Sequence, residues 1–77
     1  MLRAQGNVTE ALAHYATALQ AAPNDVDLLN QAGLAYYEDG RLDRAEAMFR
    51  RALAVDPNNA EAHNSLAGVF KLNEDLD

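Results

Sequence analysis

Apolar and polar residues alternate along the chain with the period of an α-helix, and short polar segments separate the periodic stretches. Between residues 25 and 40, apolar and small residues follow the spacing i, i+3, i+4 and i+7, which places them on one helical face. They are Leu29, Ala32, Gly33 and Tyr36. After residue 43, the inner stripe of another such stretch contains Ala45, Phe49, Ala52 and Leu53. Both stretches therefore predict amphipathic helices.

The boundaries of the helices follow from residues that end or begin helices. Pro23 and Pro57 stop a helix, and the Asn and Asp residues after each proline are suited to cap the next one. Gly40 can adopt the positive φ at which helices commonly end. These signals predict four helices and leave Met1–Gln5 as at most one turn. The predicted ranges are Thr9–Ala21, Asp25–Asp39, Asp43–Val55 and Asn59–Asn73.

The chain repeats itself along its length, and the interval from Pro23 to Pro57 is one period of the repeat. Other small or apolar residues have an identical counterpart one period earlier in the chain. These residues are Gly40, Ala45, Ala52 and Leu53. A period of this length indicates a stack of repeats, each of which buries its apolar face against its neighbours. We therefore expect an all-α fold, an α-solenoid of antiparallel helix pairs whose small residues allow close approach.

The repeated unit resembles the tetratricopeptide repeat, whose pattern has Trp, Leu-Gly and Tyr, then Ala and Phe, and finally Pro. The matching residues of the central unit are Leu29, Ala32, Gly33, Tyr36, Ala45, Phe49 and Pro57, and those of the third unit are His63, Leu66, Ala67 and Phe70. The departures are Leu29 and His63 in place of Trp, and Ala32 in place of Leu. The resemblance implies a right-handed superhelix of about two and a quarter repeats.

The resemblance also divides the chain into repeats. Residues 1–25 would be a partial repeat ending in its second helix, residues 26–59 a complete repeat, and residues 60–77 the first helix of another. The chain then reads as a segment of a longer array. Leu66, Val69 and Phe70 on the last helix would lack the helix that normally covers them, so they form a candidate face for self-association with a second copy.

Composition and charge narrow the classes of function. The net charge of −6 would repel the phosphates of a nucleic acid. No run of residues is long and apolar enough to cross a membrane, and the absence of Cys excludes disulfides and thiolate metal sites. His14 and His63 have no further ligand at metal-binding spacing, and we expect His63 to be a half-buried packing residue. We expect no catalysis, no cofactor and no metal, and a soluble chain for which the cytoplasm is favoured.

In the tetratricopeptide repeat family, the first helix of each unit lines a concave groove that holds a peptide of a partner. The resemblance assigns this role here to Asp27, Asn30, Gln31, Leu34, Tyr37, Glu38, Glu61, Asn64, Ser65, Gly68 and Lys71. Asn30 and Asn64 are one period apart and could form a ladder of amides along a peptide backbone, with ordinary solvated Asn residues as the alternative. The acids of this set favour a neutral or basic peptide and argue against an acidic chaperone tail.

Basic residues gather instead on the second helix of the central unit, at Arg41, Arg44, Arg50 and Arg51. They are either a solvated face or a separate docking patch for an acidic partner. The main interpretation of the chain is a non-catalytic protein–protein interaction module or scaffold. Two alternatives stay open: the substrate-recognition arm of a larger enzyme similar to O-GlcNAc transferase, and a self-assembling scaffold piece.

Overall fold

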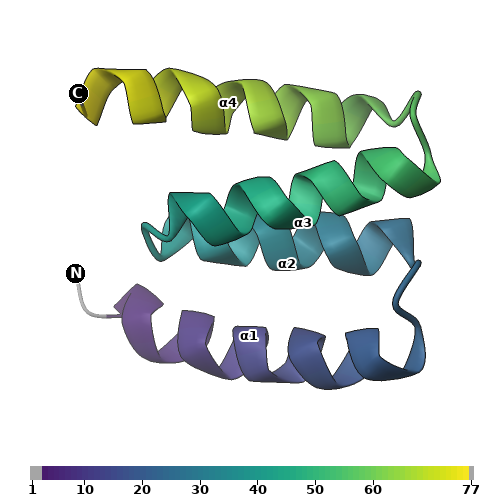
Figure 1. Ribbon diagram of the computed structural model, residues 1–77. Helices are drawn as coiled ribbons and strands as arrows, with labels where there is room; N and C mark the ends of the chain where they lie inside the picture. The colour runs from purple at the N-terminus through teal and green to yellow at the C-terminus, as the bar shows by residue number, and fades with distance from the viewer. Residues whose placement is uncertain (1–2, 77) are drawn as a thin grey trace.

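The computed structural model describes the backbone of residues 3–76 and the side chains of residues 8–74. The described backbone forms four α-helices joined by short turns. They are α1 (Arg3–Ala21), α2 (Val26–Glu38), α3 (Leu42–Val55) and α4 (Ala60–Leu76). Successive helices run antiparallel; α2 and α3 form the central pair, with α1 along one side and α4 along the other (Figure 1). The predicted all-α fold and the order of its helices are confirmed.

The first helix begins earlier than predicted. The sequence pattern places its start at Thr9, whereas α1 already begins at Arg3 and includes Gly6. Residues added to an existing helix do not bear the cost of nucleation, so a segment too short to be helical alone can extend α1. Of the segment Met1–Gln5, which was expected to form at most one turn, Met1 and Leu2 lie outside the described residues.

The two joints between repeats are built in the same way. Asp25 precedes α2, and its Oδ1 accepts a hydrogen bond of 3.2 Å from the backbone N–H of Leu28. Asn59 precedes α4, and its Oδ1 accepts a hydrogen bond of 2.8 Å from the N–H of Ala62. Each side chain satisfies an N–H that has no partner inside its own helix. The capping residues that were predicted after the prolines are therefore present at equivalent positions of the two joints.

The turn between α2 and α3 depends on Gly40, whose φ is +80°. This is the left-handed region that disfavours residues with a Cβ atom, so the helix ends where the sequence predicts. Asp39 caps α2 through its backbone N–H, and Asp43 lies in the first turn of α3, where a negative charge is favourable.

Small residues bring α2 and α3 into close contact, as the repeat pattern predicts. A Cβ atom added to Gly33 would lie 2.5 Å from Cε1 of Phe49, which is shorter than any tolerable contact. Ala45 and Ala52, one turn before and after Phe49, are fully buried, and so is Leu29 on α2. Packing of this density fixes the relative position of the two helices.

The core continues from the central pair into α4. Val69 of α4 is 0% exposed and packs with Leu42, Ala45 and Phe49 of α3. Ala62, also on α4, is buried with Leu29 and Ala52 in a second cluster. The last helix, α4, is thus anchored on the central pair by fully buried side chains.

Candidate functional site

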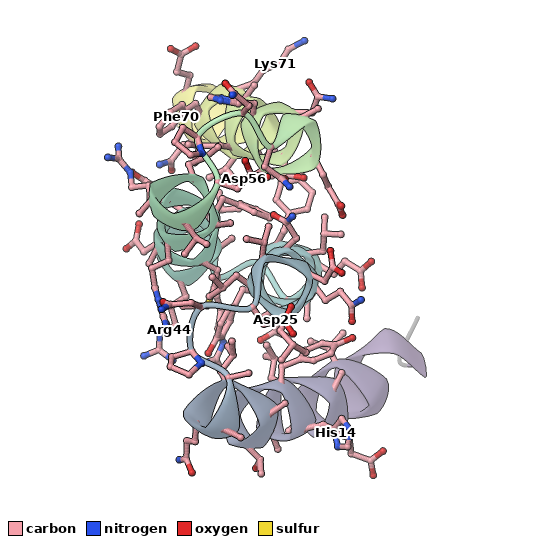
Figure 2. The ribbon with its side chains drawn as sticks, turned by 90° about the vertical axis from the view of Figure 1, so that its right-hand side faces the viewer. His14, Asp25, Arg44, Asp56, Phe70 and Lys71 are labelled. Carbon is pink, nitrogen blue, oxygen red and sulfur yellow. The ribbon has the colours of Figure 1, made fainter. Side chains whose placement is uncertain are left out.

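Most of the residues predicted to line a groove are accessible on α2 and α4. The accessible members of the set form what we call the open face: Asp27, Gln31, Leu34, Tyr37, Glu38, Glu61, Asn64, Ser65, Gly68 and Lys71. Tyr37, Ser65 and Gly68 are half-buried, and Leu34 has 37% of its surface exposed. On each helix these residues recur at intervals of three or four, so they follow one side of the helix. Figure 2 shows Lys71 on α4 directed away from the other helices.

Tyr37 connects the two halves of the open face. A Cβ atom added to Gly68 on α4 would lie 3.8 Å from the hydroxyl oxygen of Tyr37 on α2. This distance is that of an ordinary contact, so the hydroxyl of Tyr37 lies beside α4 at this position. The structure therefore brings candidate residues from two successive repeats into one continuous surface.

The proposed ladder of Asn30 and Asn64 is wrong, because only one of the two side chains reaches the surface. Asn64 is exposed, but Asn30 is 1% exposed and belongs to the interior. Nδ2 of Asn30 donates a hydrogen bond of 3.0 Å to Oδ1 of Asn59, the oxygen that also caps α4. Asn30 therefore joins two repeats and is not available to a peptide.

The charges of the open face are mainly negative. Asp27, Glu38 and Glu61 are exposed acids, and Lys71 is an exposed base. None of the ion pairs between described side chains involves these residues. Uncompensated carboxylates at the surface favour a positively charged ligand over a negative one.

The two histidines do not contribute to a common site. His14 and His63 lie on α1 and α4, and both are exposed. His63 was expected to be a half-buried packing residue, and this is wrong. Its ring turns back to the preceding loop, where Nε2 lies 2.8 Å from the carbonyl oxygen of Pro57. Among the described residues, no group of three His, Asp or Glu residues could hold a metal ion.

The arginines of the α3 region divide into two kinds. Arg41 and Arg50 form ion pairs of 2.7 Å with Asp39 and Glu46. Arg50 also lies over the ring of Phe70, 5.8 Å from its centroid. Exposed pairs of this kind contribute little to stability, about 0–1 kcal/mol each. They do, however, neutralise two of the four basic charges of the predicted docking patch.

The other two arginines keep their charge unpaired. Nη2 of Arg51 donates a hydrogen bond of 3.1 Å to the carbonyl oxygen of Pro23, which is a neutral acceptor. Arg44 has no acid within ion-pair distance among the described side chains. Figure 2 shows Arg44 on the α3 side of the molecule, between the level of α3 and that of α1.

A pocket of about 310 Å³ opens between α1, α2 and α3, on the opposite side of α2 from the open face. We call it the outer pocket. Its apolar walls include Leu12, Ala16 and Leu19 of α1 and Met48 of α3, and Tyr36 of α2 also lines it. Arg51 lines it as well, and none of its described lining residues is acidic. The sequence interpretation missed this pocket, and the signal that could have found it is the small Ala16 at the position equivalent to Arg50 one period later.

The predicted self-association face is only partly accessible. Val69 is buried in the core, so its place on this face is wrong, and Leu66 is half-buried against the same cluster. Phe70 is 41% exposed, and Leu72, which the sequence interpretation did not include, is 38% exposed. The remaining exposed apolar surface of α4 is therefore narrower than predicted. None of the described helices is long and apolar enough to cross a membrane.

Comparison with known proteins extends these observations. The family model for the tetratricopeptide repeat matches residues 2–69. The type IV pilus assembly protein PilF of Pseudomonas aeruginosa is 42% identical over 45 residues, which cover 58% of this chain and 18% of that protein. The BBSome complex member bbs-4 of Caenorhabditis elegans is 26% identical over 72 residues, which cover 94% of this chain and 16% of that protein. The matches span less than a fifth of either relative. The match over residues 2–69, together with the stacked antiparallel helices, places this chain in the tetratricopeptide repeat family.

Proposed function

We propose that this chain is a non-catalytic interaction module that holds a neutral or basic peptide segment of a protein partner against its open face. Tetratricopeptide repeat domains are generally protein–protein interaction modules and are typically non-catalytic. Beyond this general role, we propose that binding uses the open face and that the ligand is neutral or basic.

The observation that carries the proposal is the contact region of Tyr37 and Gly68. It joins the accessible sides of α2 and α4 into one surface that spans two repeats. An extended peptide of about six residues covers about 20 Å, which is enough to cross both helices. Leu34 and Tyr37 supply apolar area beside the polar groups of Gln31 and Asn64. Such a mixture suits a peptide that carries both a backbone to hydrogen-bond and apolar side chains to bury.

The rigidity of the surface supports the same function. The buried contact between Gly33 and Phe49 holds α2 against α3, and the hydrogen bond from Asn30 to Asn59 ties α2 to the start of α4. A surface that is already ordered loses little conformational entropy when it binds a ligand. The open face can therefore bind without a prior rearrangement of the helices.

The acids decide the charge of the ligand. Asp27 and Glu38 lie towards opposite ends of α2, and Glu61 lies in the first turn of α4. A lysine or arginine of a bound peptide can approach one of these carboxylates, whereas an acidic peptide would be repelled. We infer that the ligand is neutral or basic.

The relatives support a role in larger assemblies. PilF is named for the assembly of the type IV pilus, and bbs-4 is named as a member of the BBSome complex. Both names describe multi-protein structures. We infer for this chain a scaffold role of the same general kind, with partners of its own.

Self-association is a second candidate, favoured by the exposed Phe70 and Leu72 of α4. It predicts a mass that rises with protein concentration in sedimentation experiments. A mass that stays that of a monomer at high concentration would exclude it. The role of a substrate-recognition arm stays a prediction that no specific feature of the fold favours.

A charge-reversal experiment tests the open face directly. The probes are blocked, fluorescently labelled peptides in which Leu alternates with Lys, with Gln or with Glu. The double variant D27K/E61K should lower the affinity for the Lys peptide about tenfold and raise the affinity for the Glu peptide. The matched control is E10K, which changes an exposed acid on α1.

The control separates binding at the open face from attraction to the whole molecule. If E10K weakens the Lys peptide as much per charge as D27K/E61K does, the peptide responds only to the net charge of −6, and the proposal fails. Backbone amide shifts in a titration by nuclear magnetic resonance should map the Lys peptide to α2 and α4.

A further inference from the structure

The outer pocket can be compared with the equivalent positions one repeat period later in the chain. Ala16 lines the pocket beside Tyr36, and one period later their counterparts are Arg50 and Phe70. There the guanidinium of Arg50 lies 5.8 Å from the centroid of the Phe70 ring and covers it. At the first joint the methyl group of Ala16 cannot cover Tyr36 in the same way. The small side chain of Ala16 therefore contributes to the opening of the outer pocket over Tyr36.

The part of α3 that lines the pocket carries the positive charge of Arg51, and a second arginine lies further along the same side of the helix. Arg44, Met48 and Arg51 follow the spacing i, i+4, i+7, so they lie along one side of α3. Arg51 lines the pocket, and Arg44 lies two turns before it. Both residues are exposed, and neither is paired with an acid among the described side chains. In a chain with a net charge of −6, this is a local excess of positive charge.

We propose that the outer pocket is a second binding site, which takes an acidic segment of a protein partner that carries one bulky apolar side chain. The apolar side chain enters between Leu12 and Met48 and packs on the ring of Tyr36. A carboxylate of the segment accepts hydrogen bonds from Arg51, and another meets Arg44. Hydrogen bonds between guanidinium and carboxylate groups are among the stronger ones in proteins.

The dimensions of the site define the segment further. A volume of about 310 Å³ is at the lower end of the range for ligand pockets, which fits a single large side chain. Seven residues of helix separate Arg44 from Arg51, which is about 10 Å along the axis. An extended chain covers this distance in about three residues. The fitting segment therefore has two acids about three positions apart with an apolar residue between them.

This site is independent of the open face and has the opposite preference for charge. Ala32 and Tyr36 line the outer pocket from one side of α2, whereas Leu34 and Glu38 belong to the open face on the other. One module could therefore contact two partners, or two segments of one partner, at the same time. Charge complementarity would keep the two ligands from exchanging places.

The test uses the intact chain and a blocked peptide with two Asp residues three positions apart and a Phe between them. A matched peptide has Ala in place of Phe, and another has Lys in place of Asp. We expect saturable binding of the first peptide only, with amide shifts at Leu12, Ala16, Met48 and Arg51. The affinity should fall as the salt concentration rises, because exposed charges are screened.

Two variants and one control locate the binding. R51Q removes the charge at the pocket and should lower the affinity for the peptide with two Asp residues and a Phe, called the Asp–Phe peptide, about tenfold. A16R reproduces the situation of Arg50 and Phe70, so its side chain should cover Tyr36 and also weaken the peptide about tenfold, although it adds a positive charge. R50Q removes a charge from the same helix outside the pocket and should change the affinity less than about twofold. A thermal melt of each variant confirms that it is folded.

Several outcomes would overturn the proposal. Stronger binding to A16R, or equal binding of the Ala peptide, would show attraction by charge alone. Equal binding of a small aromatic carboxylate such as 3-phenylpropionate would show a small-molecule pocket in place of a peptide site. Shifts at the pocket that grow with protein concentration, without any peptide, would show that a second copy of the chain is the occupant.

Discussion

Asn30 in the middle of α2 and Asn59 at the start of α4 are joined by a hydrogen bond of 3.0 Å between their side chains. Oδ1 of Asn59 accepts this hydrogen bond and a second one from the backbone N–H of Ala62. Nδ2 of Asn59 donates a hydrogen bond of 3.3 Å to Oδ2 of Asp56. One buried amide of α2 thus holds the residue that caps α4. The position of α4, and with it half of the open face, depends on this polar contact as well as on apolar packing.

The variant N30A should therefore destabilise the fold without acting on a ligand. It removes a hydrogen bond inside the protein and leaves a small cavity, and we expect a loss of about 1–3 kcal/mol in the free energy of unfolding. Urea denaturation followed by circular dichroism measures this loss. N64A, which truncates the exposed counterpart, should stay within about 0.5 kcal/mol of the parent. If the two variants are equally stable, Asn30 has no structural role.

A second prediction concerns the contact between Gly33 and Phe49. G33A would place a Cβ atom 2.5 Å from the ring of Phe49, and overpacking of this kind costs about 1–3 kcal/mol. The matched control is G68A, because a Cβ atom there meets only the Tyr37 hydroxyl at 3.8 Å, an ordinary contact. Ala favours helix over Gly by up to about 1 kcal/mol, so G68A should be neutral or stabilising. A destabilisation of both variants by the same amount would contradict the role of Gly33 in close packing.

The regular parts of this fold could be predicted from the sequence because their causes are local or periodic. Pro23 and Pro57 mark the joints, Gly40 ends α2, and the repeat of Ala45 and Ala52 marks the close-packed side of α3. Each signal depends on spacing along the chain, which the sequence shows directly. The boundary that was missed, the start of α1, depends on whether a short segment joins an existing helix.

The environments of Asn30, His63 and Val69 could not be predicted in the same way. Their environments depend on contacts with other segments of the fold, which the spacing of residues along one helix does not show. Val69 packs with Phe49 of α3, and Asn30 donates a hydrogen bond to Asn59, the residue before α4. The outer pocket did leave a signal, since Ala16 and Arg50 differ strongly in size at equivalent positions.

A third prediction concerns the turn at Gly40. Its φ of +80° is unfavourable for any residue with a Cβ atom, while no other atom lies within 4 Å of where that atom would be. G40A should therefore cost about 1 kcal/mol in the free energy of unfolding through backbone strain alone. G40N should cost less, because Asn tolerates this region better than Ala. An equal loss for both variants in urea denaturation would point to a cause other than φ.

The last prediction separates the two adjacent apolar residues of α4. V69A removes a side chain that is 0% exposed and packed against Phe49, so we expect a loss of about 2 kcal/mol in the free energy of unfolding. F70A removes a larger side chain, but 41% of Phe70 is exposed, and the guanidinium of Arg50 lies over its ring. We expect a loss of about 1 kcal/mol or less, since cation–π contacts at exposed sites contribute about 0.5–1 kcal/mol. Urea denaturation of both variants at low protein concentration measures the difference. If F70A proves the more destabilising, α4 is anchored through its exposed side, and the assignment of Val69 to the core would have to be revised.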